Sequence, residues 1–597
     1  MLQQPPAFLS ATARRGCLAL LALVMAATAT GCAGLPRDVE RPVSAALAAP
    51  AGTALGQLVE DRRAAAGGKS PSGFLLLSGP QAAYGSRLAL VDAAQKTLDL
   101  QYYAIHADAS TERLLRAVVA AARRGVRVRV LLDDFHSTGR DAQVMRLAFV
   151  PNIEMRMFNP LAGARGSAIG RMFSVLTDFS RVQQRMHNKL FIADNALGVT
   201  GGRNLGDAYF GQAASGNFVD LDVLAAGPIV QALSRSFDSY WNNERAYPVQ
   251  SLITREELDA LRESVRAADA EQDARTAAEP ASAPAAASSA APAPADADTA
   301  QQRARIWDQQ PMDLAQARFT WAPAAVLADA PAKIPPDGAS AAAASPEPAS
   351  ATVASSTAST AAPDKEPHDA PAETVVDGLL QLMGQARRDL LIVSPYFVPG
   401  PDMLQAFAAA RARGVRVRVL TNSLASNDAP VAHAGYARHR PELLALGVEL
   451  YEMRSELPGG LGGVFGSTGS GGSTGTRGGG PTGSAGSSRA MLHSKLLILD
   501  GRLLAIGSMN LDMRSQRQNT EIALLIRSGD LSQRATAQIE QALGEAAWHV
   551  EQQGDGHLVW HAPQGSGLPD ATTEPDASAP LRLMLRLLGP LAPDHLL

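Results

Sequence analysis

The alternation of apolar and polar residues in this 597-residue chain switches between a helix pattern and a strand pattern several times. Apolar residues three and four apart indicate amphipathic helices, and short continuous apolar runs directly after them indicate buried strands. The expected elements are helices over 85–97, 113–125, 377–386 and 403–414, and strands over 98–105, 126–134, 389–397 and 415–423. In each half a helix that ends at a glycine precedes the residues VRVRVL, which indicates an internal duplication.

A polar motif, H-x-K-x₄-D, occurs once downstream of each of these blocks. Its histidine and lysine are two residues apart, so on a strand they point to the same face. The apolar runs LFIA and LLIL that follow predict a fully buried strand of the parallel type, with each polar pair at its mouth. An imidazole beside an ammonium suits a phosphate-like ligand, because the lysine supplies charge and the histidine a nucleophile or a proton. The motif residues are His187, Lys189, Asp194, His493, Lys495 and Asp500.

Structural histidines are the alternative interpretation of these positions, and lysine usage argues against it. The chain has 54 lysines and arginines, but only six of them are lysines. Lys189 and Lys495 are two of those six. A general preference for cations would have placed arginine there as well.

Net charge and cysteine content limit the remaining classes of function. The formal charge of −4 provides no general basic surface for nucleic acid. Arg14 and Arg15 precede an apolar run that is too short to span a membrane, and TGCAG follows it around Cys32. This pattern is similar to a bacterial lipoprotein signal with Cys32 as the acylated residue; an uncleaved anchor or plain secretion are the alternatives. The other cysteine, Cys17, lies within the signal, so disulfides and cysteine metal sites are not expected.

Composition also suggests the domain boundaries. Ala/Gly/Pro-rich and Ala/Pro/Ser-rich stretches bury little and indicate tethers or linkers, whereas the α/β patterns indicate domains. The expected division is a signal peptide over 1–31, a flexible tether over 32–72, a first domain over 73–266, a linker over 267–372 with an ordered island near 316–333, a second domain over 373–560 with a Gly/Ser-rich insert over 459–488, and a tail over 561–597. The tail contains a basic amphipathic stretch that is compatible with membrane contact or with packing on a domain.

The two motifs, followed by GGRN at 201–204 and GSMN at 507–510, resemble the signature of the phospholipase D superfamily. The resemblance implies an α/β fold with two duplicated α/β/α domains. Their mixed sheets would pack about a pseudo-two-fold axis and share one active site. It also implies covalent catalysis without a metal or other cofactor.

Within that resemblance each motif residue has an implied role. His187 would attack phosphorus, and His493 would protonate the leaving alcohol and then activate the incoming one. Lys189 and Lys495, together with Asn204 and Asn510, would hold the non-bridging oxygens, while Asp194 and Asp500 look architectural. A carboxylate should orient each histidine: Glu521 fits this role, and Asp220 is its counterpart, with Asp222 as the second choice.

A finer resemblance, over nearly all of 75–560, is to bacterial cardiolipin synthases, most of all the C-type branch. It rests on TDFSRVQQRMHNK, GGRNLGDAYFG, SPYFVP, TNSLASNDAPVAHAGYAR and GVELYEM. It implies transfer of a phosphatidyl group to phosphatidylglycerol from a second phospholipid, either phosphatidylglycerol or phosphatidylethanolamine. The lipoprotein-like signal, and not this resemblance, predicts a membrane-anchored protein that faces the periplasm of a diderm bacterium. Tyr103, Tyr396, His433 and Tyr436 would line the headgroup channel.

Several alternatives stay open at this point. A hydrolytic phospholipase D would share the motifs, because the covalent intermediate is common to both reactions. The acidic charge balance disfavours a nuclease of the same superfamily. The complete motifs in both halves disfavour a non-catalytic lipoprotein. The donor lipid, the membrane that holds the anchor, the oligomeric state and the need for an accessory protein are not specified by the sequence.

Overall fold

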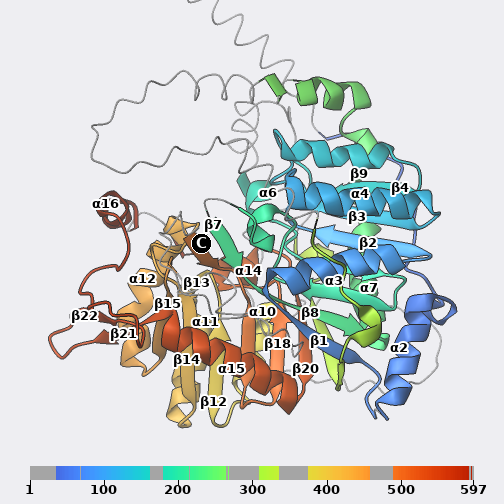
Figure 1. Ribbon diagram of the computed structural model, residues 1–597. Helices are drawn as coiled ribbons and strands as arrows, with labels where there is room; N and C mark the ends of the chain where they lie inside the picture. Colours follow the sequence, from blue (N-terminus) through green and yellow to red (C-terminus); the bar gives the residue numbers. More distant parts are fainter. Residues whose placement is uncertain are drawn as a thin grey trace, which may run out of the picture.

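Two α/β halves, each built on a mixed nine-stranded sheet, make up the described part of the chain (Figure 1). The computed structural model describes residues 35–67, 69–161, 179–213, 216–263, 266–267, 308–334, 374–456, 489–589 and 593–594. The signal-like segment 1–31, Cys32, the insert 459–488 and most of the linker 267–372 lie outside the described residues.

The first sheet has three parallel strands near one end and antiparallel neighbours on either side of them. In sheet order its strands are β10 (Thr320–Trp321), β1 (Gly73–Ser78), β8 (Leu221–Ala226), β6 (Leu197–Gly201), β5 (Leu190–Ala193), β2 (Thr97–Tyr102), β3 (Arg127–Asp133), β4 (Ile153–Phe158) and β9 (Ala246–Pro248).

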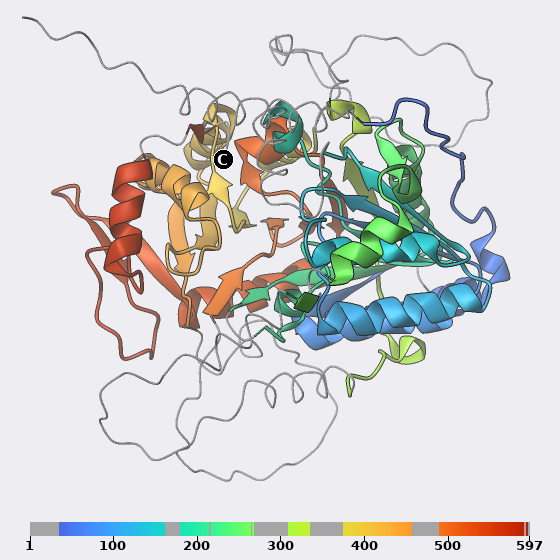
Figure 2. The ribbon, with the colours of Figure 1, turned by 90° about the horizontal axis from the view of Figure 1, so that it is seen from above.

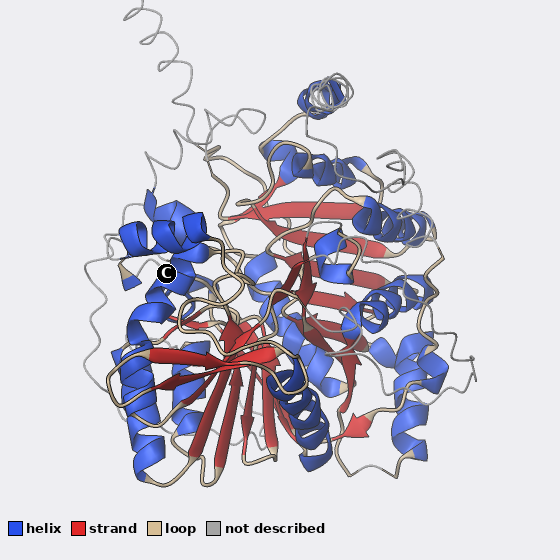
Figure 3. Cartoon of the chain, turned by 60° about the vertical axis from the view of Figure 1, so that its left-hand side comes forward, coloured by secondary structure: helices blue, strands red, loops and turns tan. Residues whose placement is uncertain are grey.

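The second sheet repeats this plan, and Figure 3 shows both sheets with their helices. In order its strands are β11 (Ala324–Ala328), β20 (Ile522–Arg527), β18 (Leu503–Gly507), β17 (Leu496–Leu499), β12 (Asp389–Val393), β14 (Arg416–Asn422), β15 (Glu449–Met453), β21 (Ala547–Gln552) and β22 (Leu558–His561). The run from β8 to β9 matches the run from β20 to β21 in order and in strand direction. The predicted duplication is therefore confirmed at the level of topology.

The two motif strands, β5 and β17, run antiparallel to both of their neighbours, which corrects the expectation of a parallel type. Their continuous apolar character has another cause. Phe191 of β5 faces the core of the first half, whereas Ile192 faces a core shared by both halves. A strand covered on both faces is apolar throughout, whatever the direction of its neighbours.

Helices pack on both faces of each sheet, and the two halves lie side by side (Figure 2). The Asp108 side chain caps the helix α4 by accepting a hydrogen bond from the Thr111 amide, and Gly125 after the helix has φ +97°. The main helices are α3 (Gly79–Ala93), α4 (Ala109–Arg123) and α7 (Pro228–Trp241) in the first half, and α10 (Val375–Met383), α11 (Pro401–Ala412), α12 (Pro430–Ala445) and α15 (Gly529–Glu545) in the second.

Residues 35–67 pack on the first half, although their composition predicts a flexible tether. Helix α2 (Ala54–Ala65) begins at Thr53, whose side chain accepts from the Gly56 amide. Leu55 and Val59, one helical turn apart, enter the core of the first half. Hydrogen bonds from Arg129, Arg156 and Asn195 to backbone carbonyls of residues 42–47 also fix this segment, whose overall composition is that of a linker.

The two halves are joined by a shared core and by strand pairing across the interface. Strands β7 (Gly216–Val219) and β16 (Arg489–Leu492) pair in parallel. The ordered island in the linker goes further, because β10 extends the first sheet and β11, a few residues later, extends the second. This short segment of the linker therefore supplies one edge strand to each of the two sheets.

Candidate active site

The two repeated motifs come together at the interface between the halves. The His187 amide donates to the Thr520 carbonyl (2.9 Å), and the His493 amide donates to the Val219 carbonyl (2.8 Å). Each motif is thus held by a backbone contact to the opposite half, and the two contacts are equivalent, as a pseudo-two-fold axis requires. The predicted single centre built from both halves is present in the fold.

Each histidine is oriented by a carboxylate from the other half. His187 Nδ1 lies 3.0 Å from both carboxylate oxygens of Glu521, and His493 Nδ1 lies 2.8 Å from Asp220 Oδ2. A carboxylate at Nδ1 fixes the proton there, so Nε2 of each ring is the atom available to a substrate. The sequence identifies both carboxylates but not this crosswise pairing.

The two carboxylates lie in different surroundings. Glu521 also accepts hydrogen bonds from Ser508 Oγ (2.5 Å) and Ser515 Oγ (2.9 Å). Burial would raise the pKa of Glu521, but the charge and hydrogen bond of His187 bring this pKa below its ordinary value. Burial raises the pKa of Asp220 above its ordinary value, in spite of the nearby Arg203 and Lys495. Glu521 is therefore the better counter-ion for a cationic imidazole.

The lysines and histidines of the motifs are almost fully buried beside one another. Each lysine Nζ donates to the carbonyl of its own motif histidine at 2.6 Å. Burial lowers the pKa of His187 to about 4 and that of His493 well below its ordinary value. Burial likewise lowers the pKa of Lys189 to about 7 and that of Lys495 to about 8. A phosphate entering the site would supply the negative charge that these groups lack, and so favour their protonated forms.

The two asparagines differ in their hydrogen bonding. Asn204 accepts from the Ala104 amide (3.1 Å) and donates from Nδ2 to the Tyr209 hydroxyl (3.0 Å). Asn510 is also buried, and its Oδ1 has no hydrogen-bond partner among the described residues. Asn510 therefore keeps more of its hydrogen-bonding capacity for a ligand.

Asp194 and Asp500 occupy equivalent turns away from the histidines. Both have positive φ, +50° and +52°. Asp194 accepts from the amides of residues 95, 96 and 97, and Asp500 accepts from those of residues 387, 388 and 389. In each half the carboxylate thus fixes the segment that leads into the strand beside the motif strand, an architectural position.

Asp222, the second choice for orienting a histidine, lies against arginines instead. Its Oδ2 is 3.0 Å from Arg87 and 3.3 Å from Arg203. All three side chains are buried. Asp220 is therefore the carboxylate that contacts His493.

Two of the four residues predicted to line a headgroup channel lie near the centre. The Tyr103 ring is 5.1 Å from the His187 ring, and the Tyr396 hydroxyl donates to Asp428 (2.8 Å). Tyr209, which the sequence analysis did not single out, has the corresponding position 5.3 Å from the His493 ring. Its place three residues after the GGRNLG stretch was the only signal available.

The other two, His433 and Tyr436, belong to a buried ionic network on α12, and their place in a headgroup channel stays a prediction. Tyr436 donates to Glu452 (3.0 Å), and His433 Nε2 lies 2.8 Å from Arg440 and 3.3 Å from Glu574. Both side chains are almost fully buried. The resemblance that named these two residues gave no sign of the arginine and the two glutamates that contact them.

Two residues of the linker island also support the centre, and sequence reasoning missed their role. Asp329 Oδ2 accepts from the Glu521 amide (2.9 Å) and from Lys333 Nζ (2.7 Å). Lys333 donates as well to the Ser515 carbonyl (2.8 Å). Lys333 is one of the six lysines, so the rarity that identified the motif lysines also applied to it.

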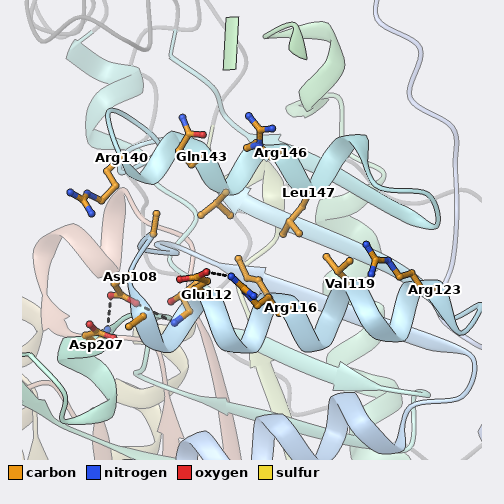
Figure 4. A pocket seen from close by; sticks show the side chains of 15 residues that line it. Asp108, Glu112, Arg116, Val119, Arg123, Arg140, Gln143, Arg146, Leu147 and Asp207 are labelled. Carbon is orange, nitrogen blue, oxygen red and sulfur yellow. Dashed lines mark hydrogen bonds and ion pairs between the residues drawn. The ribbon is translucent and has the colours of Figure 1, made fainter. Parts of the chain in front are cut away.

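A groove of about 960 Å³ lies between α4 and the 3₁₀ helix η2 (Asp141–Phe149), beside the centre but outside it (Figure 4). Leu115, Val119 and Leu147 contribute apolar side chains, and Arg116 and Arg146 are among its charged residues. None of the repeated-motif residues lines this groove. No helix in the described ranges is both long and apolar enough to cross a bilayer.

The fold and the site together define a class: a two-half phospholipase D-like enzyme with one phosphate-directed centre. A family model described as "Cardiolipin synthase, PLD-like domain" matches residues 88–241 and 379–543. Cardiolipin synthase C of Escherichia coli (strain K12) is 33% identical over 519 residues, covering 86% of this chain and 94% of that protein. An uncharacterized protein of Helicobacter pylori (strain ATCC 700392 / 26695) is 29% identical over 499 residues, covering 83% of this chain and 84% of its own.

Among solved structures, the phosphatidylserine synthase of Haemophilus influenzae Rd KW20 aligns with a TM-score of 0.50. The alignment covers 91% of this chain and 100% of that one at 12% identity, which supports the fold alone. The chain belongs to the cardiolipin synthase-like family of the phospholipase D superfamily. It is a phosphatidyltransferase of that superfamily.

Proposed function

We propose that this enzyme makes cardiolipin by transferring a phosphatidyl group to phosphatidylglycerol from a second phospholipid, either phosphatidylglycerol or phosphatidylethanolamine. The observation that carries the proposal is the pair of buried histidines, each held at Nδ1 by a carboxylate of the opposite half. Two equivalent imidazoles with free Nε2 atoms suit a two-step displacement at one phosphorus atom, in which one ring is nucleophile and the other acid and base.

In the first step His187 Nε2 attacks phosphorus and the bond from phosphorus to the donor's headgroup oxygen breaks. His493 gives its proton to that oxygen, so glycerol or ethanolamine leaves and a phosphatidyl-histidine remains. In the second step His493 takes the proton of a phosphatidylglycerol hydroxyl, whose oxygen attacks phosphorus and releases His187. Glu521 stabilises the positive charge on His187 throughout, and Asp220 does the same for His493.

Lys189 and Lys495, assisted by Asn204 and Asn510, would hold the non-bridging oxygens of the phosphodiester. Negative charge on these oxygens grows in the transition state, where a good donor contributes about 3 kcal/mol. Both lysines are close enough to influence the pKa of His493. Both lysines also act on the pKa of His187, and this closeness to both histidines supports the role.

Transfer rather than hydrolysis requires that water be kept from the intermediate. His187 and His493 are only 8% and 4% exposed. Such burial supports transfer, because a lipid hydroxyl that arrives with its own apolar chains displaces water from the mouth of the site.

We further propose that the protein is a lipoprotein acylated at Cys32 and faces the periplasm. The apolar run before Cys32 supports this, and export of a phospholipid-modifying enzyme to a membrane surface agrees with its substrate class. Mass spectrometry of the protein from membranes tests it: a diacylglyceryl group on Cys32 is the expected result.

The decisive experiment uses the protein with phosphatidylglycerol vesicles, with and without phosphatidylethanolamine, and lipid analysis by mass spectrometry. Cardiolipin with release of glycerol or ethanolamine supports the proposal and names the donor. Phosphatidic acid alone would make the enzyme a hydrolase. Degradation of DNA or RNA faster than lipid would contradict the lipid substrate altogether.

A further inference from the structure

The C-terminal helix α16 (Ala579–Leu588) is attached to the second half by one apolar side. Leu581 and Leu585, one turn apart, pack on Leu424 and Ala425. These two partners follow β14 directly in the chain. The helix therefore lies against the loop that follows β14, and Figure 1 shows it beside α12.

The opposite side of α16 is apolar too, but it is exposed. Leu583, Met584 and Leu587 are 58%, 36% and 63% exposed. The other exposed large apolar side chains in the described ranges, Val43, Val431 and Leu568, lie in three separate segments of the chain. Single exposed apolar residues are normal on protein surfaces, whereas a cluster on one helix face marks a contact surface.

The position of α16 is fixed by the chain before it. Glu574 lies 2.5 Å from Arg440 Nη1, and Asp576 accepts from Trp548 Nε1 (3.3 Å). The charges of Arg440 and His433 oppose the effect of burial and hold the pKa of Glu574 far below its ordinary value. The exposed face therefore belongs to a helix anchored by buried ionic contacts.

The loop beneath α16 leads into the candidate active site. It continues from Leu424 to Asp428, which accepts from the Tyr396 hydroxyl. The charge of Asp428 also acts on Lys495, where it opposes the effect of burial on the pKa. The loop from Leu424 to Asp428 thus contacts α16 at its start and lies near Lys495 at its end.

The charge of α16 favours an anionic surface. The helix contains Arg582 and Arg586 and no acidic residue. Arg586 and the apolar residues beside it are exposed. Arginines flanking an apolar helix face are the pattern of helices that lie in the headgroup region of anionic membranes.

We propose that the outer face of α16 inserts into the headgroup region of an anionic phospholipid membrane and so places the mouth of the active site against its lipid substrates. The inference rests on the proposed function for the identity of the lipid. It commits to a bilayer, rather than another protein, as the partner of this face.

The test uses the mature chain from residue 33 onward, which contains no cysteine, so that no native thiol, no signal segment and no acyl anchor remain. A single Leu587→Cys carries the polarity-sensitive fluorophore NBD. The matched control carries the label at Gly554→Cys in the turn between β21 and β22, where an added Cβ meets nothing within 4 Å. Vesicles contain equal amounts of phosphatidylglycerol and phosphatidylcholine, or phosphatidylcholine alone.

The expected result is a several-fold rise and a blue shift of emission for the label at 587 on the anionic vesicles only, with no change at 554. The pair Leu583→Ser and Leu587→Ser, made in the label-free chain, should weaken sedimentation with these vesicles about tenfold or more, because it removes two inserting side chains.

Equal emission from both positions on vesicles that sediment the protein would overturn the proposal, and so would an absence of sedimentation. A label at 587 already shifted without vesicles would also overturn it, because another part of the chain would then cover the face. Insertion without any lipid turnover would refute the proposed function while leaving this inference standing.

Discussion

The crosswise pairing of histidines and carboxylates makes a specific kinetic prediction. Glu521→Gln preserves the shape of the side chain that contacts His187 but removes its charge. Because His187 is the proposed nucleophile, the variant should be slow in forming the phosphatidyl-histidine intermediate. Asp220→Asn, its counterpart across the pseudo-two-fold axis, should act on the acid–base step of His493 instead.

The size of the effect follows from the 3.0 Å contact between His187 Nδ1 and the Glu521 carboxylate. With about 4 Å between the centres of charge and an effective dielectric constant of about 20, the attraction in the charged intermediate is about 4 kcal/mol. One factor of ten in rate corresponds to about 1.4 kcal/mol, so formation should slow by about 10²- to 10³-fold. The amide oxygen of the variant can still accept the hydrogen bond from His187 Nδ1, so the lower end of this range is expected.

The two steps separate when the donor is a phosphatidyl ester of p-nitrophenol, whose leaving group needs no acid. Rapid mixing should then show a slow burst for Glu521→Gln, and a normal burst followed by slow turnover for Asp220→Asn. Circular dichroism of both variants provides the control for folding. If Glu521→Gln gave the normal burst and Asp220→Asn the slow one, the crosswise assignment or the choice of His187 as nucleophile would be refuted.

Three further predictions concern pH and stability. Since burial lowers the pKa of Lys189 to about 7 and that of Lys495 to about 8, kcat/KM should fall as the pH rises through this range and these ammonium groups lose their protons; a profile that stays flat to pH 9 would contradict the role of the lysines. Asp194→Ala should lower the free energy of unfolding by about 3–4 kcal/mol. Asp500→Ala should lower it by only about 1–2 kcal/mol, because water can reach the amides that lose their acceptor. A urea titration that gave the reverse order would refute this. Arg440→Met should cost about 3–5 kcal/mol in the same titration, since it leaves two glutamates buried without their counter-ion, and an unchanged midpoint would show that the network contributes nothing.

Much of the site follows from local sequence because its chemistry is local. The two-residue spacing from histidine to lysine sets both side chains on one face of the chain, and the duplication brings two such pairs together. The crosswise carboxylates could not be predicted in the same way. Glu521 is close in sequence to His493 but contacts His187, because pairing across the interface depends on how the halves dock.

Other differences from the sequence-based expectations have similar causes. Apolar runs on β5 and β17 indicated burial correctly but not strand direction, since both faces are covered for a reason unrelated to parallel pairing. Composition averaged over residues 32–72 concealed α2, which places Leu55 and Val59 in the core of the first half. Averages describe a segment, whereas folding responds to the few residues that reach a core.

The linker island carries a consequence for how the enzyme can move. Strand β10 belongs to one sheet and β11 to the other, and Asp329 just after them holds the amide of Glu521. The Asp329 carbonyl also accepts a hydrogen bond from the Tyr240 hydroxyl of the first half (2.7 Å). A hinge opening of the two halves would break these contacts of the linker island and displace the Glu521 carboxylate that contacts His187. We therefore expect lipids to enter and leave by local rearrangement at the mouth of the site, without separation of the two halves.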